Sequence, residues 1–284
     1  MNRKQAKIAV NRQSSLLGKV LFLAVLIAVL GSVLPAAAQI TVRGKLAHDL
    51  DVTPGMVVTG SIMVDNDSDA MQEAKVYLRD YMFYADGTNA YDDPGTVGRS
   101  NAPWVRFTPE SMRIPPRTSV AVNYEITVPD TTGPGSYWSI LMVEGVDASS
   151  AESTEGAASE RQVGFRQVTR YGVQLALHYK ENAEQSVSFD NIQLLVDENG
   201  KTFFQVDISN SGGLMLHPNV YLRVFDADGA EFGPFQGSLY RMYPETSVRH
   251  RIELAGLASG TYQALLIVDN GEDAVFGGQY ELTL

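Results

Sequence analysis

The strongest constraint on the fold of this chain is an alternation of apolar and polar residues with a period of two. The runs in the first half are Ile40–Leu46, Met56–Val64, Ala74–Arg79, Ser119–Val128, Gly135–Val143 and Gly164–Tyr179. Because successive side chains of a β-strand point to opposite faces, each run predicts a strand with one face in a core. No long helical pattern competes, so we predict an all-β fold.

The second half repeats this pattern. Its runs are Val187–Val196, Thr202–Ser209, Asn219–Asp226, Ser238–Met242, Ser247–Leu254, Gly260–Val268 and Gln279–Leu284. Short strands at this spacing, separated by turn residues, favour an immunoglobulin-like β-sandwich over a barrel. We therefore predict two immunoglobulin-like sandwiches in tandem, at residues 39–180 and 184–284, separated by the polar stretch Lys180–Glu184.

An export signal precedes these domains. Basic residues come before the apolar run Val20–Leu30, and small residues lead to Gln39. This arrangement is typical of a cleaved secretory signal peptide at residues 1–38. The alternative is an uncleaved membrane anchor, because Val20–Ala38 is almost long enough to span a bilayer. No second apolar segment of that length follows, so we expect a periplasmic or extracellular protein with no membrane span after cleavage.

Charge and cysteine content narrow the possible functions. Residues 1–38 hold five of the 22 Lys and Arg residues and none of the 33 Asp and Glu residues, so the mature chain carries 17 basic and 33 acidic side chains, a formal charge of −16. Such a charge repels nucleic acid and favours neutral or basic partners. The chain has no cysteine, hence no disulfide and no thiolate chemistry.

Motifs for catalysis are lacking in the sequence. The four histidines, His48, His178, His217 and His250, show no metal-binding spacing, and we expect each at the surface or in a loop. No nucleophile elbow or phosphate-binding loop is present. We therefore expect a protein that is not an enzyme and has no cofactor.

One acidic turn begins like a calcium-binding loop. Asp65–Asp69 has alternate acidic residues, but Ala70 and Val76 stand where such a loop needs Gly and Glu. We expect an ordinary turn stabilised by its Asp and Asn side chains, and no metal.

Two further segments could contact a partner. Residues 147–160 contain no apolar side chain larger than Ala, which is typical of an exposed insertion or of a segment that orders on binding. Aromatic residues are dense between Tyr77 and Trp104, where they could bind carbohydrate or peptide or fill a core. We expect Tyr81, Phe83 and Trp104 in the first core, and Tyr84 and Tyr91 on a loop where they contact a partner.

The turn residues resemble those of two protein families. The first half carries Pro54-Gly55, Asp86-Gly87, Phe107-Thr108-Pro109, Pro115-Pro116 and Gly135-Ser136-Tyr137, and the second half carries Asn210-Ser211-Gly212, Asp228-Gly229, Tyr243-Pro244-Glu245 and Gly260-Thr261-Tyr262. The first set resembles the first domain of periplasmic pilus chaperones. Both sets together resemble the tandem sandwich proteins that partner WxL proteins on bacterial surfaces.

The chaperone resemblance implies a mechanism. An edge strand with alternating apolar residues is lent to an incomplete subunit, and basic residues grip the terminal carboxylate of that subunit. The lending strand would be Gln162–Tyr171, in which Val163 and Phe165 are the apolar members. Arg43 and Arg170 are the candidates for the grip, which two guanidinium groups could form, and the alternative is that both are solvated cations on strand faces.

These observations predict an exported, non-enzymatic protein-binding module. Its partner would be an exported subunit or a surface protein, and its role would be chaperone-like in the assembly of pili or surface proteins by β-strand addition. The alternative is a surface or matrix adhesion module that binds glycan or a surface protein.

Overall fold

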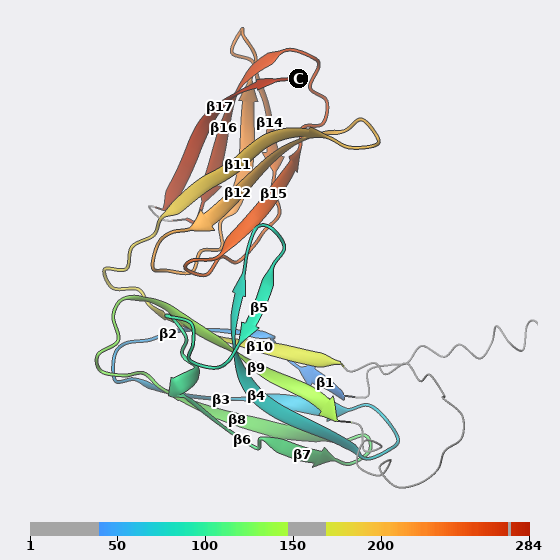
Figure 1. Ribbon diagram of the computed structural model, residues 1–284, viewed down its shortest axis with the longest axis vertical. Coiled ribbons are helices and arrows are strands. Elements are labelled where there is room, and N and C mark those ends of the chain that lie inside the picture. Colours follow the sequence, from blue (N-terminus) through green and yellow to red (C-terminus); the bar gives the residue numbers. More distant parts are fainter. Residues whose placement is uncertain (1–39, 147–168, 272–273) are drawn as a thin grey trace, which may run out of the picture. The chain divides into compact units, whose positions relative to one another are not determined.

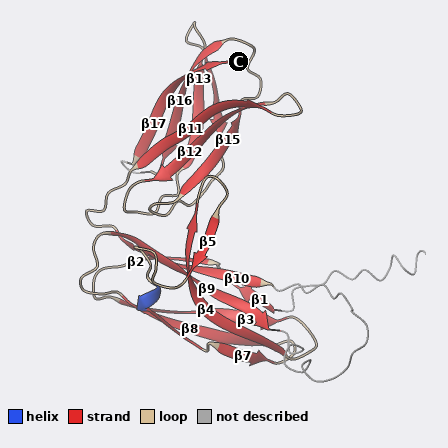
Figure 2. Ribbon diagram, viewed as in Figure 1, coloured by secondary structure: helices blue, strands red, loops and turns tan. Residues whose placement is uncertain are grey.

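The computed structural model describes residues 40–146, 169–271 and 274–284. Within these ranges nearly all regular structure is β-strand, and the one helix is a short 3₁₀ turn, η1 (Ala102–Trp104) (Figure 2). None of the described helices is long and apolar enough to cross a membrane. Residues Gln39–Leu284 belong to one compact unit. The predicted signal peptide lies outside the described residues.

The first sandwich contains ten strands in two sheets (Figure 1). They are β1 (Ile40–Arg43), β2 (Ala47–Asp51), β3 (Val57–Asn66), β4 (Gln72–Phe83), β5 (Asn89–Asp92), β6 (Val105–Thr108), β7 (Ser111–Ile114), β8 (Ser119–Thr127), β9 (Gly135–Val146) and β10 (Arg170–Tyr179). One sheet has the order β1-β3-β8-β6. The other has the order β2-β10-β9-β4-β5, with β7 also paired to β4.

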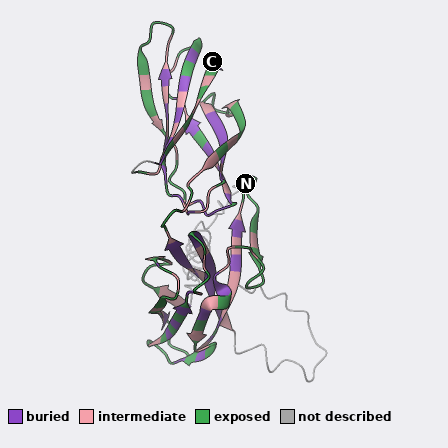
Figure 3. Ribbon diagram, turned by 90° about the vertical axis from the view of Figure 1, so that its left-hand side faces the viewer, coloured by how far each residue is buried: buried purple, intermediate pink, exposed green. Residues whose placement is uncertain are grey.

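Alternate side chains of these strands fill the first core. On β10, Val173, Leu175 and Leu177 are fully buried, and Tyr171 packs against the same cluster. The predicted face of this strand is therefore confirmed for its described part. Figure 3 shows this alternation as bands of buried and exposed residues along the strands.

The second sandwich contains seven strands. They are β11 (Val187–Val196), β12 (Thr202–Asn210), β13 (Asn219–Phe225), β14 (Glu231–Gln236), β15 (Ser247–Glu253), β16 (Thr261–Asp269) and β17 (Val275–Thr283). They form the sheets β11-β12-β15 and β14-β13-β16-β17 around a core that includes Phe204, Leu222 and Leu266. The predicted all-β fold with two β-sandwiches is confirmed.

One predicted strand is wrong. Residues 238–242 form no strand, and only a single bridge joins Leu216 to Met242. The strand lies earlier, at β14, where Gly233 and Pro234 make the sequence look like a turn. Because β14 is at the edge of its sheet, it tolerates a proline that a central strand would not.

An aromatic cluster joins the two sandwiches. Tyr243 of the second sandwich is fully buried and stacks on Trp138 of β9, with ring centroids 4.6 Å apart. Its hydroxyl donates a hydrogen bond of 2.8 Å to Oε1 of Gln174 on β10. Phe83 also packs here, with its centroid 6.3 Å from that of Tyr243, so its predicted place in the first core is wrong. The sequence pattern could not show that a second sandwich covers this end of the sheet.

Of the other two aromatic residues expected in the first core, one packs against it and one does not. Trp104 packs against that core. Tyr81 instead lies on the outer face of β4, where its ring meets that of Tyr91. The period of two assigns residues to a face, but an outer face can also be partly buried by neighbouring strands.

Two histidines expected at the surface are buried. His178 on β10 is 6% exposed, and its Nδ1 lies 2.8 Å from the hydroxyl of Ser136. His250 on β15 is 2% exposed and faces the second core, where neither ring nitrogen has a hydrogen-bond partner. Desolvation by burial lowers the pKa of His250 from 6.5 to about 4.

The burial of His250 predicts an acid-dependent loss of stability. The unfolded chain binds a proton at this residue near pH 6.5, whereas the folded chain binds it only near pH 4. The stability that depends on a neutral His250 is therefore complete above pH 6.5 and is lost as the pH falls toward 4, a change of about 3 kcal/mol. We expect His250→Leu to remove most of this loss when urea unfolding is compared at about pH 7.5 and about pH 4.5.

A matched control is His217→Leu, because His217 is exposed in a loop. This variant should lose stability in acid as the wild-type chain does. An equal loss in the wild-type chain and in His250→Leu would contradict the prediction.

Candidate functional site

A large hollow lies on the outer face of the sheet formed by β5, β4, β9 and β10. Its volume is about 1050 Å³. The lining residues are Lys75, Tyr77, Leu78, Arg79, Tyr81, Tyr91, Asp93, Pro94, Ile140, Met142, Glu144, Arg170, Gly172 and Gln174. On β4, every second side chain from Lys75 to Tyr81 turns outward because Val76 between them turns into the core.

Glu144 is the centre of a cluster of polar side chains in this hollow. Its side chain is only 11% exposed and accepts hydrogen bonds from the Tyr77 hydroxyl and from Arg170 Nε, each at 2.8 Å. The Lys75 ammonium lies 3.2 Å from the same carboxylate. Lys75 and Arg170 are the residues opposite Glu144 on β4 and β10, so strand register itself brings the three charges together.

The hydrogen bonds keep Glu144 ionised. Burial alone would raise the pKa of this carboxyl, but the hydrogen bonds from Tyr77, Arg170 and Lys75 outweigh that cost and lower the pKa. Burial raises the pKa of Tyr77, and the hydrogen bond to Glu144 raises it further. At neutral pH the cluster therefore holds one carboxylate, two cations and a neutral phenol, which leaves one excess positive charge.

The floor of the hollow is apolar. Ile140 and Met142 turn outward from β9 but are only 4% and 8% exposed. A Cβ added at Gly172 on β10 would lie 2.9 Å from Cγ2 of Ile140, so a side chain there would displace Ile140. Glycine at this position lets the apolar strip of β9 pack directly against β10.

One wall of the hollow is aromatic. The rings of Tyr81 and Tyr91 have centroids 4.9 Å apart, and Tyr91 is 53% exposed. Beside them Arg79 forms an ion pair with Asp93. This wall offers an exposed ring face next to planar polar groups, which can bind the apolar face and the hydroxyls of a sugar or the side chains of a peptide.

Among the described residues, strand β10 has an open edge next to the hollow. On one side β9 pairs with all of Arg170–Tyr179, whereas on the other side β2 pairs only with Gln174–His178. The amide of Gln174 donates to the Leu46 carbonyl at 2.9 Å, so alternate residues from Gln174 backward point their backbone groups to that side. The backbone groups of Arg170 and Gly172 therefore have no strand partner among the described residues.

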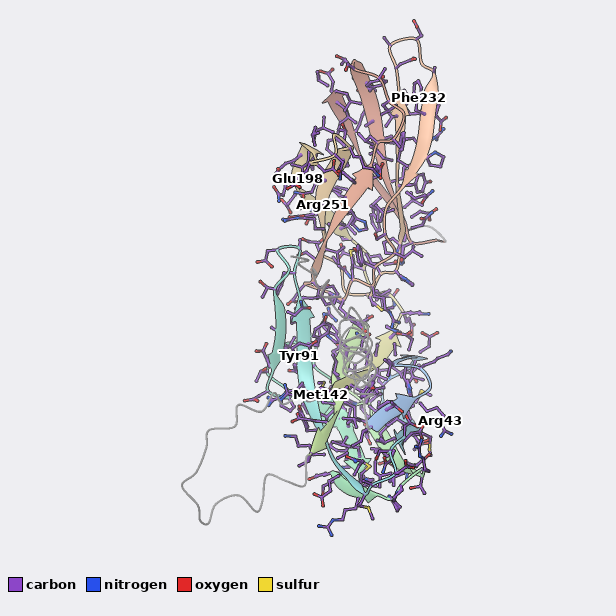
Figure 4. All side chains as sticks on the ribbon, turned by 90° about the vertical axis from the view of Figure 1, so that its right-hand side faces the viewer. Arg43, Tyr91, Met142, Glu198, Phe232 and Arg251 are labelled. Atoms are coloured by element: carbon purple, nitrogen blue, oxygen red, sulfur yellow. The ribbon has the colours of Figure 1, made fainter. Side chains whose placement is uncertain are left out.

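The structure brings two of the predicted contact residues to this hollow. Arg170 and Tyr91 both line it. Arg43 lies on β1 in the other sheet, where it forms two hydrogen bonds of 2.8 Å with Asp65, and Figure 4 shows it apart from Met142 and Tyr91. The two arginines thus do not share one site, and each contacts its own carboxylate.

The remaining predicted contacts lie elsewhere. Val163 and Phe165 are outside the described residues, as is the acidic segment at 147–160. Tyr84 is exposed at the end of β4, where it lines a smaller hollow together with Leu239 and Tyr240 of the second sandwich.

The polar side chains of the acidic turn after β3 are hydrogen-bonded within the chain. The side-chain oxygen Oδ1 of Asn66 accepts a hydrogen bond from the backbone amide of Ser68 at 2.9 Å, and its Nδ2 donates to the backbone carbonyl of Ile114 at 2.9 Å. Asp65 is engaged by Arg43. Among the described residues, no group of three or more His, Asp and Glu side chains is arranged to hold a metal ion.

Sequence reasoning missed Glu144 and Lys75 as members of the site. A signal was present, because Glu144 is a lone carboxylate directly after the strongly apolar run Ile140–Val143 and so has to find a cation or water. The alternation of Lys75, Tyr77 and Arg79 also marks one polar face of β4. What the sequence does not give is the register that sets these two strands side by side.

Comparison with known proteins identifies structures but no family. No family model matches the sequence, and no curated protein matches it. Among solved structures, the class 5 fimbriae chaperone CfaA is 13% identical, with a TM-score of 0.45 over 84% of this chain and 98% of its own. The chaperone DraB of E. coli is 12% identical, with a TM-score of 0.40 over 86% and 98% of the two chains. The CupB2 chaperone of Pseudomonas aeruginosa is 10% identical, with a TM-score of 0.41 over 86% and 100%. Because these TM-scores lie below 0.5, the fold rests on the strand order of this chain itself.

The Glu144 cluster predicts a specific cost of mutation. Glu144→Gln leaves Lys75 and Arg170 close together without their carboxylate, so we expect the free energy of unfolding at neutral pH to fall by about 1–3 kcal/mol. Because the pKa of Glu144 is lowered in the folded chain, this stabilisation is present above the ordinary carboxyl pKa and is lost as the pH falls below it. The difference between the two proteins in urea unfolding should therefore shrink in acid.

The control is Asp93→Asn, because Asp93 is 81% exposed in its ion pair with Arg79. We expect it to cost less than about 1 kcal/mol. If Asp93→Asn costs as much as Glu144→Gln, the buried cluster has no special role in stability.

Proposed function

We propose that this protein is an exported, non-enzymatic protein-binding module that holds a partner by β-strand addition at the open edge of β10. In this proposal it acts like a chaperone in the assembly of pili or surface proteins, in the periplasm or outside the cell. The observation that carries the proposal is the edge at Arg170 and Gly172, whose backbone groups lack a strand partner among the described residues. The resemblance of its turn residues to those of pilus chaperones supports the same function.

The hollow beside this edge gives the added strand a place for its side chains. Main-chain hydrogen bonds to Arg170 and Gly172 would supply affinity without regard to sequence. Side chains that point outward from the added strand would lie near the apolar floor at Ile140 and Met142, on the strand next to β10. This floor would supply specificity.

In this proposal Val163 and Phe165, which lie outside the described residues, would extend the edge beyond the N-terminus of β10. They have the same parity as Tyr171 and Val173, whose side chains turn toward the first core. In the proposal these two apolar side chains are lent to an incomplete partner, whose core they help to fill.

In this proposal Arg170, and not Arg43, binds the terminal carboxylate of the partner. Arg170 lies at the open edge with Lys75 nearby, and the two cations share the single carboxylate of Glu144. Because one positive charge is in excess, Arg170 or Lys75 can donate a charge-assisted hydrogen bond to a second carboxylate, from the partner. Arg43 contributes to binding only if the partner also reaches β1.

A second candidate function is adhesion to a glycan. The observation that favours it is the exposed Tyr91 ring beside the ion pair of Arg79 and Asp93. In that case Tyr91→Ala would abolish binding, whereas changes before β10 would leave it intact.

The strand-addition proposal predicts the effect of charges on the lent residues. Replacing Val163 and Phe165 together by Asp should leave the fold intact, because both precede the described core positions of β10. Capture of the partner from a periplasmic extract by the immobilised protein should fall by roughly tenfold or more. Circular dichroism and thermal unfolding measure the fold of each variant.

The matched control is Val57→Asp, because Val57 is a 53% exposed valine on β3 in the other sheet. It should capture the partner as well as the wild-type chain does. If the double variant folds and captures normally, the partner binds elsewhere, and if it unfolds, Val163 and Phe165 belong to the core and the proposal loses its support.

A further inference from the structure

The edges of the second sandwich differ in how well they are protected against pairing. β14 contains Pro234 and an irregular register opposite Leu222–Val224. β11 has a register shift between Asp190 and Gln193, and β15 carries Arg249 and Arg251. Proline, bulges and charges are the usual devices that prevent an edge strand from adding to another chain.

β17 has almost none of these devices. Its nine residues pair with β16 in one continuous register, from Val275 opposite Asp269 to Thr283 opposite Thr261. The strand contains no proline, and Glu281 is its only charged residue. It is also the terminal strand of its sheet, so its other side has no partner strand among the described residues.

The hydrogen-bond pattern shows which residues face that side. Leu284 and Gly260 exchange two backbone hydrogen bonds, of 2.9 and 3.1 Å. In an antiparallel pair such residues alternate with residues whose backbone groups point away from the partner. The residues of β17 that point outward are therefore Val275, Gly277, Gln279, Glu281 and Thr283, and all five are exposed.

We propose that this edge is a homodimer interface, in which β17 pairs antiparallel with β17 of a second copy across a twofold axis at Gln279. In this register Val275 lies opposite Thr283 of the second copy, and Gly277 lies opposite Glu281. The single charge of the strand therefore meets a glycine and never a like charge. About ten main-chain hydrogen bonds form, and the two four-stranded sheets become one continuous sheet.

A second copy of the chain is favoured over a different partner because the residues that lie opposite each other in the two β17 strands fit together. Val275 and Thr283, which lie opposite each other, are both β-branched and of similar size, and Glu281 lies opposite Gly277, which leaves room for its longer side chain. The formal charge of −16 on each mature chain opposes association, so salt should strengthen the dimer by screening that repulsion.

The absence of cysteine allows a direct test. In the mature chain with Gln279→Cys, the introduced thiol is the only one, and the two copies of residue 279 lie opposite each other at about 5.5 Å between Cα atoms, within the range of a disulfide. We expect a disulfide-linked dimer on a non-reducing gel after mild oxidation. The control is Gln263→Cys on β16, which is equally exposed but one strand away from the edge. Equal cross-linking of the two variants would overturn the proposal.

A second test uses proline. Gln279→Pro removes an outward N–H but no hydrogen bond to β16, whereas Gln279→Ala keeps the outward N–H. Analytical ultracentrifugation should show a dimer for the wild-type chain and Gln279→Ala, and a dissociation constant raised roughly tenfold or more for Gln279→Pro. A monomeric wild-type chain at about 100 μM, or equal dimerisation of all three proteins, would overturn the proposal.

The dimer at β17 and the partner binding at β10 can be tested separately. Gln279→Pro should still capture the partner, because β10 is unchanged. If the variant loses capture while the wild-type chain is monomeric, the edge of β17 binds the partner and not a second copy. If Gln279→Pro does not fold, the comparison of Gln279→Cys with Gln263→Cys decides whether the dimer forms.

Discussion

The pairing of β9 with β10 is the constraint on which the rest of the first sandwich depends. Its register runs without a break from Arg170 opposite Glu144 to Tyr179 opposite Gly135. The inner faces of both strands fill the core, and their outer faces form the floor of the hollow and the contact with Tyr243. Because the chain has no disulfide, this sheet and the two apolar cores supply the stability. Among the described residues, the edge of β10 is open at Arg170 and Gly172 because β2 pairs only with Gln174–His178, whereas β9 pairs with all of β10.

Much of this architecture could be predicted from the alternation of residue types. A period of two identifies strands and assigns each residue to a face, which was enough for the two sandwiches and for the buried face of β10. The pattern cannot tell whether an outer face is covered by a second element. Phe83 and His178 were misplaced for this reason, and the strand β14 was missed because an edge strand may contain proline.

The candidate site was harder to predict because it depends on non-local register. Arg170 and Tyr91 were singled out for separate reasons, and only the order β5-β4-β9-β10 brings them to one hollow. Arg43 has the same chemistry as Arg170 but lies on the other sheet, where Asp65 engages it. The cluster around Glu144 also depends on strand register, because Lys75 and Arg170 lie on the two strands that pair with β9 on either side of Glu144.

The most direct test of the account is amide hydrogen exchange at the edge of β10. The amide of Gln174 donates to the Leu46 carbonyl, whereas the amide of Gly172, on the same side of the same strand, has no partner among the described residues. In the free protein, the NMR signal of the Gly172 amide should exchange with deuterium roughly a hundredfold or more faster than that of Gln174. Equal protection of the two amides would show that the edge is already covered and would contradict strand addition at this site.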